Sequence, residues 1–398
     1  MTSEQQTPAD PTDERVHRLP GQGLLDNASL LALGCVMKVA VLGAGAGGAA
    51  AVAELVNAGH EVRFWGRSAE TLAPHQAIGG VAFEGELGEG IAKPKLITTD
   101  IEAAVANADV AVVVLPTFSH SSVASALANC GWSADKPIVL NRGHTGGALE
   151  FAETFTRGGK RAPAVVQFSP LTYVARKHRP DGVRITGRAK QVKAAALNGG
   201  SKEIEVAAKL FPRATPVSDV IASGLSNVNM ILHSPGAVLA AAWVEATGGN
   251  FTFYVDAMTP GVARTMRRLD EERLAVAGAF GHQLPNLIEE MKLIGTVEAT
   301  VIYSTDFQAA IAGGKANSKI KGPDSLEHRY YREDFGHGLL PFLELANIAG
   351  VDMPVARSLF LLAQTTVGID YRAGGRTAAA MGIAGLSKDQ LLEKVSER

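Results

Sequence analysis

Short apolar runs alternate with stretches of helical periodicity along the first half of the chain. The run from Ala108 to Leu115 is nearly continuous, which is typical of a strand covered by helices on both faces. Such alternation predicts an α/β fold with a doubly wound parallel sheet, in which ligands bind beyond the carboxyl ends of the strands. The predicted strands are residues 39–42, 61–65, 81–83, 95–98, 108–115, 137–141, 164–168, 173–175, 183–186 and 191–195.

Helical periodicity takes over after about residue 216. We therefore predict a sheet-containing domain over residues 37–215 and an all-helical domain over residues 216–398, with a ligand site in the cleft between them. The charged residues from Arg267 to Arg273 are interpreted as a solvated face of one helix. The predicted helices are residues 225–246, 260–280, 286–290, 307–312, 339–348, 354–368, 377–381 and 388–396.

Residues 1–36 differ from the rest of the chain because they begin with a polar, charged and proline-containing stretch. We expect them to be a disordered or dispensable tail. Met37 stands immediately before the first predicted strand, so translation is expected to begin there if the tail is absent from the native protein.

The composition is that of an ordinary folded protein and excludes several classes. The 398 residues are 46% hydrophobic and 20% charged, and the formal net charge of -2 favours neither nucleic acid nor an acidic membrane surface. No run of apolar residues is long enough to predict a membrane span. The two cysteines, Cys35 and Cys130, cannot build a disulfide framework, so we expect a cytoplasmic protein.

A glycine-rich turn, Gly43-Ala-Gly45-Ala-Gly47-Gly48, follows the first predicted strand and opens a predicted helix. Missing side chains let the backbone approach a pyrophosphate, and the helix N-terminus supplies free N–H groups and a positive dipole end. In this context the turn predicts a Rossmann dinucleotide site. The alternative is a glycine turn that binds no ligand.

The loops after the strands that end at Leu42, Trp65, Leu115 and Asn141 are expected to form the wall of the cofactor site, because they lie at the carboxyl ends of the strands. Pro116, which ends one of these strands, is therefore a candidate cofactor-binding residue.

The segment after the second predicted strand bears on which nicotinamide cofactor is bound. Sites that prefer NAD usually carry an acid there, which pairs with the ribose 2′-hydroxyl. This chain has Arg67 and Ser68, which could hold a 2′-phosphate by charge and by a hydroxyl group. The pattern favours NADP over NAD. The alternative is that Arg67 is a solvated arginine that stacks on adenine.

Hydride transfer to a carbonyl or imine carbon needs a proton donor, and histidine is the usual choice. His233 lies on a mostly apolar predicted helix, with Asn229 one turn earlier on the same face. The pattern alone leaves His233 open between a core histidine and a catalytic one. The segment 328–336 combines two arginines and two acids, which could orient an imidazole and clamp a carboxylate, or could form a solvated turn. His144, in a cofactor-wall loop, is a candidate contact for nucleotide or substrate.

From Met37 to about Leu386 the chain resembles the opine dehydrogenases of the octopine and nopaline dehydrogenase type. Their pattern joins a Rossmann domain to a helical catalytic domain. The motifs that carry the resemblance are the glycine turn, Asn141-Arg-Gly-His-Thr-Gly-Gly-Ala-Leu-Glu-Phe151, Ser226-Asn-Val-Asn229-x-x-x-His233, Phe253-Tyr254-x-x-x-x-Thr259-Pro260 with Leu269-Asp270-x-Glu272-Arg273, and Arg329-Tyr330-x-x-Glu333-Asp334.

The resemblance implies roles for several residues. His233 would be the catalytic acid/base, Asp334 its partner, Arg329 the ligand of a keto acid carboxylate, and Asn229 part of the site lining. The implied reaction is reductive condensation of an L-amino acid with an α-keto acid such as pyruvate, through an imine. Octopine-type members carry an acid where this chain has Arg67 and Ser68, which again puts NAD in doubt.

Other functions stay open at this point. One is a 2-keto acid reductase of the ketopantoate type, and another is a sensor that binds NADP without turnover. The identity of the amino acid and the oligomeric state are not encoded in any pattern we recognise, and a homodimer is one open alternative.

Overall fold

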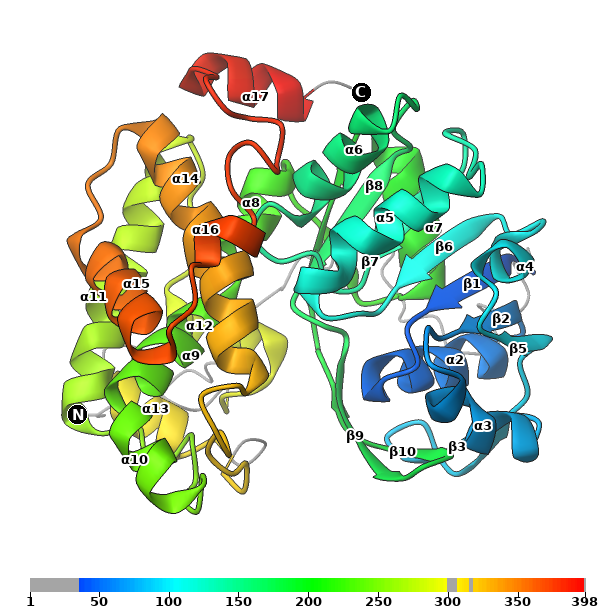
Figure 1. The fold of residues 1–398 in the computed structure, drawn as a ribbon, viewed down its shortest axis with the longest axis horizontal. Helices are drawn as coiled ribbons and strands as arrows, with labels where there is room; N and C mark the ends of the chain where they lie inside the picture. The colour runs from blue at the N-terminus through cyan, green and yellow to red at the C-terminus, as the bar shows by residue number, and fades with distance from the viewer. Residues whose placement is uncertain (1–35, 299–305, 315–317, 397–398) are drawn as a thin grey trace, which may run out of the picture. The chain divides into compact units, whose positions relative to one another are not determined.

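The computed structural model describes residues 36–298, 306–314 and 318–396 (Figure 1). The predicted tail, residues 1–36, lies outside the described residues except for Val36. No helix among the described residues is long and apolar enough to cross a membrane.

The described residues contain an eight-stranded main sheet with the order β12-β11-β8-β7-β6-β1-β2-β5. Its strands pair in parallel except for β8 and β11, so the predicted doubly wound α/β fold is confirmed. The strands are β1 (Lys38–Leu42), β2 (Glu61–Trp65), β5 (Leu96–Thr98), β6 (Val110–Val113), β7 (Ile138–Leu140), β8 (Val165–Ser169), β11 (Val192–Leu197) and β12 (Ala214–Pro216). Its helices are α2 (Ala46–Asn57), α3 (Ala69–Ala77), α4 (Ile101–Val105), α5 (His120–Asn129), α6 (Gly147–Arg157) and α7 (Ser201–Leu210), with a short 3-10 turn, η1 (Thr117–Ser119).

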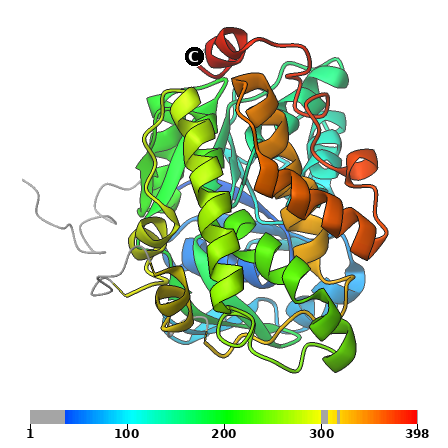
Figure 2. The ribbon, with the colours of Figure 1, turned by 90° about the vertical axis from the view of Figure 1, so that its left-hand side faces the viewer.

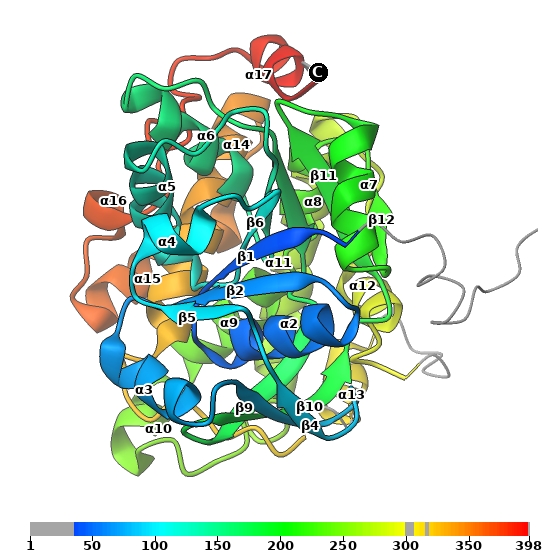
Figure 3. The same ribbon diagram turned by 90° about the vertical axis from the view of Figure 1, so that its right-hand side faces the viewer.

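Three of the predicted strands do not join the main sheet. Together with β4, which was not predicted, they form a second, four-stranded sheet with the order β4-β3-β10-β9, in which β9 and β10 are an antiparallel pair. Helix α2 packs against both sheets, as Figure 3 shows, and most of its buried side chains are those of alanine. The strands are β3 (Val81–Gly85), β4 (Gly90–Ala92), β9 (Tyr173–Arg179) and β10 (Gly182–Arg188).

The second half of the described chain is helical, as predicted (Figure 2). Helix α9 packs against α11, α12, α15 and η2. The predicted helix 225–246 is wrong in its continuity, because it breaks after α8 and again at Ala240. The predicted helix 377–381 is a turn. The elements are α8 (Val220–Leu225), α9 (Val228–Leu239), α10 (Ala241–Thr247), α11 (Pro260–Ala279), α12 (Leu287–Ile294), α13 (Phe307–Ala312), the π-helix η2 (Tyr330–Leu339), α14 (Leu340–Ala349), α15 (Pro354–Val367), α16 (Tyr371–Gly374) and α17 (Lys388–Ser396).

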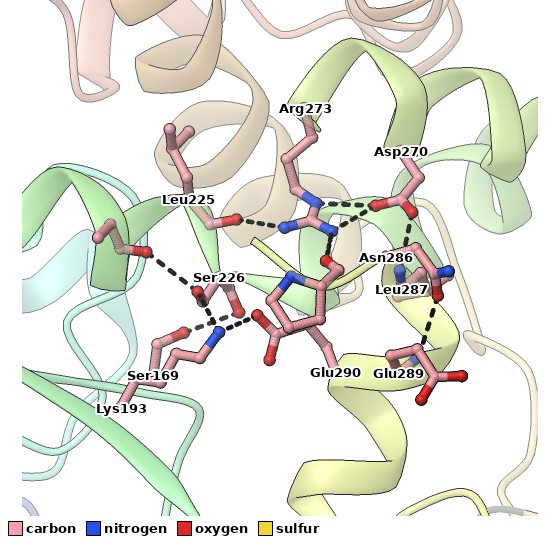
Figure 4. A network of polar contacts seen from close by, with 12 residues as sticks. Ser169, Lys193, Leu225, Ser226, Asp270, Arg273, Asn286, Leu287, Glu289 and Glu290 are labelled. Atoms are coloured by element: carbon pink, nitrogen blue, oxygen red, sulfur yellow. Dashed lines mark hydrogen bonds and ion pairs between the residues drawn. The ribbon is translucent and has the colours of Figure 1, made fainter. Parts of the chain in front are cut away.

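A buried polar network fixes the start of the helical half (Figure 4). Arg273 and Asp270 on α11 are only 1% and 2% exposed, so the interpretation of this stretch as a solvated face is wrong for these two residues. Arg273 pairs with Asp270 at 2.7 Å and donates to the backbone carbonyl of Leu225, the last residue of α8. Lys193 on β11 pairs with Glu290 on α12. These contacts hold the α8–α9 junction, from which the helix that carries His233 begins.

Candidate active site

The glycine turn has the geometry of a phosphate cradle. Gly43 has a φ of +132°, and a Cβ there would lie 2.3 Å from the carbonyl oxygen of Val114. A Cβ on Gly48 would lie 1.7 Å from the carbonyl oxygen of Gly43, so these two positions require glycine for the turn itself. A Cβ on Gly45 would meet no atom of the described residues within 4 Å, and Gly45 begins α2 without a side-chain cap. The open approach to uncapped N–H groups fits a dinucleotide pyrophosphate.

The residues predicted to meet the ribose lie at the carboxyl end of β2. Ser68 is the N-cap of α3, where its Oγ accepts the N–H of Thr71 at 3.2 Å. The hydroxyl hydrogen of Ser68 is free to donate outward, and the Arg67 side chain is exposed. Arg67 and Ser68 therefore lie at the N-terminus of α3 with no carboxylate between Trp65 and Ala69, and the first acid, Glu70, follows in the first turn of α3.

His233 and Asp334 meet in the interior of the helical half. Nδ1 of His233 lies 2.7 Å from Oδ2 of Asp334, although the two residues are 101 positions apart. Each residue is 4% exposed, and the imidazole stacks on the ring of Tyr330 at 3.9 Å between centroids. The Asp334 carboxylate accepts hydrogen bonds, so Nδ1 donates to it and Nε2 is left for another partner. This nitrogen lies 2.7 Å from the hydroxyl of Tyr254.

The carboxylate of this pair comes from η2, a π-helix that packs along α9. Helices of this type are rare in proteins, and those that occur are often found at functional sites. Here η2 turns Tyr330 and Asp334 toward the same imidazole, one by stacking and the other by a hydrogen bond.

Arg329 stands just before η2, the element that carries Tyr330 and Asp334. Its side chain is 43% exposed, its Nη1 lies 3.6 Å from Glu333, and its guanidinium sits over the ring of Tyr330. A guanidinium in this position keeps donor groups that can reach a ligand carboxylate. Asn229 is half-buried on α9, one turn before His233.

Glu333 joins the cofactor-wall loops to η2, a function that the sequence did not reveal. Its Oε1 accepts the N–H of Thr117 at 3.0 Å, and its Oε2 pairs with Arg142 at 2.5 Å. Burial alone would raise the pKa of Glu333, but the guanidinium of Arg142 and its cationic surroundings hold that pKa well below its usual range. The loop that begins at Pro116 is thus tied directly to the residue before Asp334.

His144 is buried in the loop after β7. It is 2% exposed, has a φ of +56°, and its Nδ1 lies 2.7 Å from Oδ1 of Asn227 at the start of α9. This contact holds the cofactor-wall loop against α9. The predicted contact of His144 with nucleotide or substrate stays a prediction.

Two more histidines, His120 and His337, are buried, and the charges of Glu333 and Arg376 act on both rings. Burial lowers the pKa of both, and the positive charge of Arg376 lowers it further, so that the pKa of His337 falls to about 3. Burial, followed by the charge of Arg142, also lowers the pKa of His144. All three rings are therefore neutral in the folded protein near neutral pH.

The lowered pKa values of these histidines predict that the free energy of unfolding decreases as the pH falls below neutrality. An unfolded histidine takes up a proton below a pKa of about 6.5, whereas the folded His337 does so only near 3, so stability must fall as the pH drops between these values. We expect His337 alone to lower the free energy of unfolding by about 2 kcal/mol at pH 5. Urea unfolding from pH 7.5 to pH 5 measures the slope. His337→Asn should flatten it, and an unchanged slope would contradict this origin.

Each half of the chain matches a family model. The family model for NAD/NADP octopine/nopaline dehydrogenase, alpha-helical domain, matches residues 216–367, and that for the N-terminus of NAD-dependent glycerol-3-phosphate dehydrogenase matches residues 38–155. An opine dehydrogenase from Arthrobacter sp. (strain 1C) is 33% identical over 350 residues, which cover 87% of this chain and 96% of that relative.

Solved structures share the fold. Octopine dehydrogenase with NADH and L-arginine has a TM-score of 0.72 at 21% identity, with 90% of this chain and 98% of that chain covered. Yersinopine dehydrogenase with NADP+ bound has a TM-score of 0.69 at 15% identity, with 91% and 98% covered.

The chain belongs to the opine dehydrogenase family. It is an NAD(P)-dependent oxidoreductase that acts on CH–NH groups. The alternative of a sensor without turnover is therefore not favoured.

Proposed function

We propose that the protein catalyses the NAD(P)H-dependent reductive condensation of an L-amino acid with an α-keto acid such as pyruvate. The observation that carries the proposal is the buried His233–Asp334 pair, with the half-exposed Arg329 five residues before Asp334. Residues 37–215 would bind the nucleotide, and residues 216–398 would hold the substrates and the acid/base. The similar octopine dehydrogenase binds NADH and L-arginine, which supports an amino acid as one of the two substrates.

Each of these residues has a distinct task in the proposal. Arg329 would bind a substrate carboxylate through two parallel hydrogen bonds, which fixes the reacting carbon beside it. His233 would supply and recover the proton, and Asp334 would hold the ring and stabilise its charged form. The bound nicotinamide would supply the hydride. Asn229 would line the same pocket.

The reaction can be tested with a matrix of substrates. NADPH and NADH oxidation is followed with pyruvate, 2-oxoglutarate or glyoxylate against a panel of L-amino acids, and the secondary amine dicarboxylic acid is identified by mass spectrometry. We expect oxidation only when both substrates are present. Equal rates with the keto acid alone, and no amine product, would favour the 2-keto acid reductase instead.

The proposal includes a preference for NADP, which predicts the effect of Arg67→Ala. Loss of one charge-assisted contact to the 2′-phosphate costs about 1.5–3 kcal/mol, so KM for NADPH should rise about 10- to 100-fold while KM for NADH changes little. Steady-state kinetics with both cofactors measures this. Arg161→Ala removes an exposed arginine just before β8, which is separated from β2 in the sheet by β7, β6 and β1; it is the control and should change neither constant. Equal effects on both cofactors would contradict the assignment.

A further inference from the structure

We propose that Tyr254 is a catalytic residue that passes the proton between His233 and the substrate. This inference rests on the proposed function and concerns the same site. The observation behind it is a hydrogen bond of 2.7 Å between the Tyr254 hydroxyl and Nε2 of His233.

The hydrogen bond matters because it occupies the nitrogen that should face the substrate. Nδ1 is bonded to Asp334, so Nε2 is the nitrogen through which the ring can exchange a proton with anything else. The stack on Tyr330 and the contact with Asp334 fix the plane of the ring. A proton that leaves Nε2 in this arrangement goes first to the oxygen of Tyr254.

Tyr254 is suited to receive one proton while it gives up another. It lies in the segment between α10 and α11, is 6% exposed, and touches the edge of the His233 ring at 6.1 Å between centroids. Burial raises the pKa of Tyr254 well above 10, and the neighbouring phenol of Tyr330 raises it further. The hydroxyl thus stays protonated at neutral pH, and it can donate and accept at the same time.

The neighbours of Tyr254 place it beside the proposed carboxylate site. Tyr330 lies between the two parts of the site, since its ring stacks on His233 and carries the guanidinium of Arg329 over it at 5.6 Å. The carbon that reacts in an α-keto acid is bonded to the carboxylate carbon. Because Nδ1 of His233 is bonded to Asp334 and Nε2 to Tyr254, proton exchange between such a substrate and His233 would take place on the Tyr254 side of the ring.

The proton relay would act in the loss of water from the carbinolamine that the two substrates form. The Tyr254 O–H bond breaks and its proton goes to the carbinolamine hydroxyl. The C–O bond breaks, water leaves, and the nitrogen lone pair forms the C=N bond. The Nε2–H bond of the His233 imidazolium breaks and its proton restores the Tyr254 hydroxyl. The phenol is unchanged, His233 ends neutral, and the positive charge moves to the iminium nitrogen.

Tyr254→Phe tests this role, and Tyr331→Phe is the matched control. Tyr331 is fully buried on η2, and its hydroxyl donates to the carbonyl of Ala237 on α9 at 2.9 Å. Loss of the Tyr331 hydroxyl therefore removes a structural hydrogen bond between η2 and α9, the two helices that carry Asp334 and His233. We expect Tyr254→Phe to lower kcat about 10²-fold with little change in KM for the keto acid. Tyr331→Phe should keep kcat within a few-fold.

Two further readouts separate a proton relay from a packing role. The solvent isotope effect measured in mixtures of H2O and D2O should indicate two moving protons in the wild type and one in Tyr254→Phe. The nitrogen-15 NMR signal of His233 Nε2 should shift in Tyr254→Phe but not in Tyr331→Phe, whether or not the enzyme turns over.

The possible failures can be told apart. A wild type that makes a secondary amine product, with Tyr254→Phe at the same rate and with the same pH profile, would overturn the relay and leave the proposed function standing. Equal losses in Tyr254→Phe and Tyr331→Phe, or an unmoved Nε2 signal, would also overturn the relay. Absence of product from the wild type with every substrate pair would overturn the proposed function together with the relay.

Discussion

His233→Ala is expected to lower kcat by about 10³-fold and to leave nucleotide binding intact. The imidazole is the only proton-carrying group that the described structure pairs with Asp334, so its removal deletes the acid/base and leaves a buried carboxylate without this partner. The cradle of Gly43, Gly45 and Gly48 belongs to the other half of the chain and does not depend on this ring. Turnover with the best substrate pair and NADPH fluorescence titration measure the two effects.

Asp334→Asn separates the proton chemistry from the loss of bulk. The amide keeps the shape of the side chain but can donate to Nδ1, which would select the other tautomer and a poorer base. We expect a loss in kcat similar to that of His233→Ala with a nearly native melting temperature. His178→Ala, on β9 of the four-stranded sheet beside Glu84, is the control and should be active. Near-normal turnover of His233→Ala would refute the catalytic assignment.

Local sequence features predicted the parts of the fold that depend on local geometry. The turn at Gly43 could be recognised because a strand, a tight glycine turn and a helix follow one another within a few residues, and the backbone there accepts no side chain. Helices α13 and α17 were also predicted with the bounds that the structure has. These elements carry their own start and stop signals, such as the N-cap Asp306.

Features that depend on distant partners could not be predicted in this way. Strand β10 pairs with β3 about a hundred residues earlier, and nothing in its own alternation distinguishes this pairing from membership of the main sheet. The break at Ser226 and Asn227 lies inside a continuous apolar pattern, and it is the bonds of these residues to β8, β11 and the loop of His144 that fix it.

The candidate site shows the same division. The motif around Arg329 and Asp334 was recognised from its resemblance to a family, whereas the hydroxyl of Tyr254 on Nε2 and the pairing of Arg142 with Glu333 were not. The sequence contains the residues of these contacts, but the contacts themselves join segments that are 21 and 191 positions apart. The interpretation of Asp270 and Arg273 was wrong because oppositely charged residues three positions apart are common on exposed helix faces. The spacing does not reveal whether such a pair is buried.

Glu333→Gln is expected to destabilise the protein by about 3–5 kcal/mol, a large part of an ordinary free energy of unfolding. Glutamine can still accept the N–H of Thr117, but it leaves the guanidinium of Arg142, which is 8% exposed, buried without a counter-charge. Because Glu333 precedes Asp334 on η2, we also expect a lower kcat from displacement of that carboxylate. Chemical denaturation and steady-state kinetics measure the two losses.

Two controls show whether the charge pair is the cause. The double variant with Arg142→Gln removes the unpaired charge as well, so its loss of stability should be smaller than the sum of the two single losses. Glu271→Gln breaks the exposed pair with Arg268 on α11 and should change stability little, since solvent screens that pair. If Glu333→Gln unfolded at the same denaturant concentration as Glu271→Gln, other contacts would have to hold the loops after β6 and β7 to η2. That result would refute the inference that Glu333 connects the cofactor-wall loops to the element that carries Asp334.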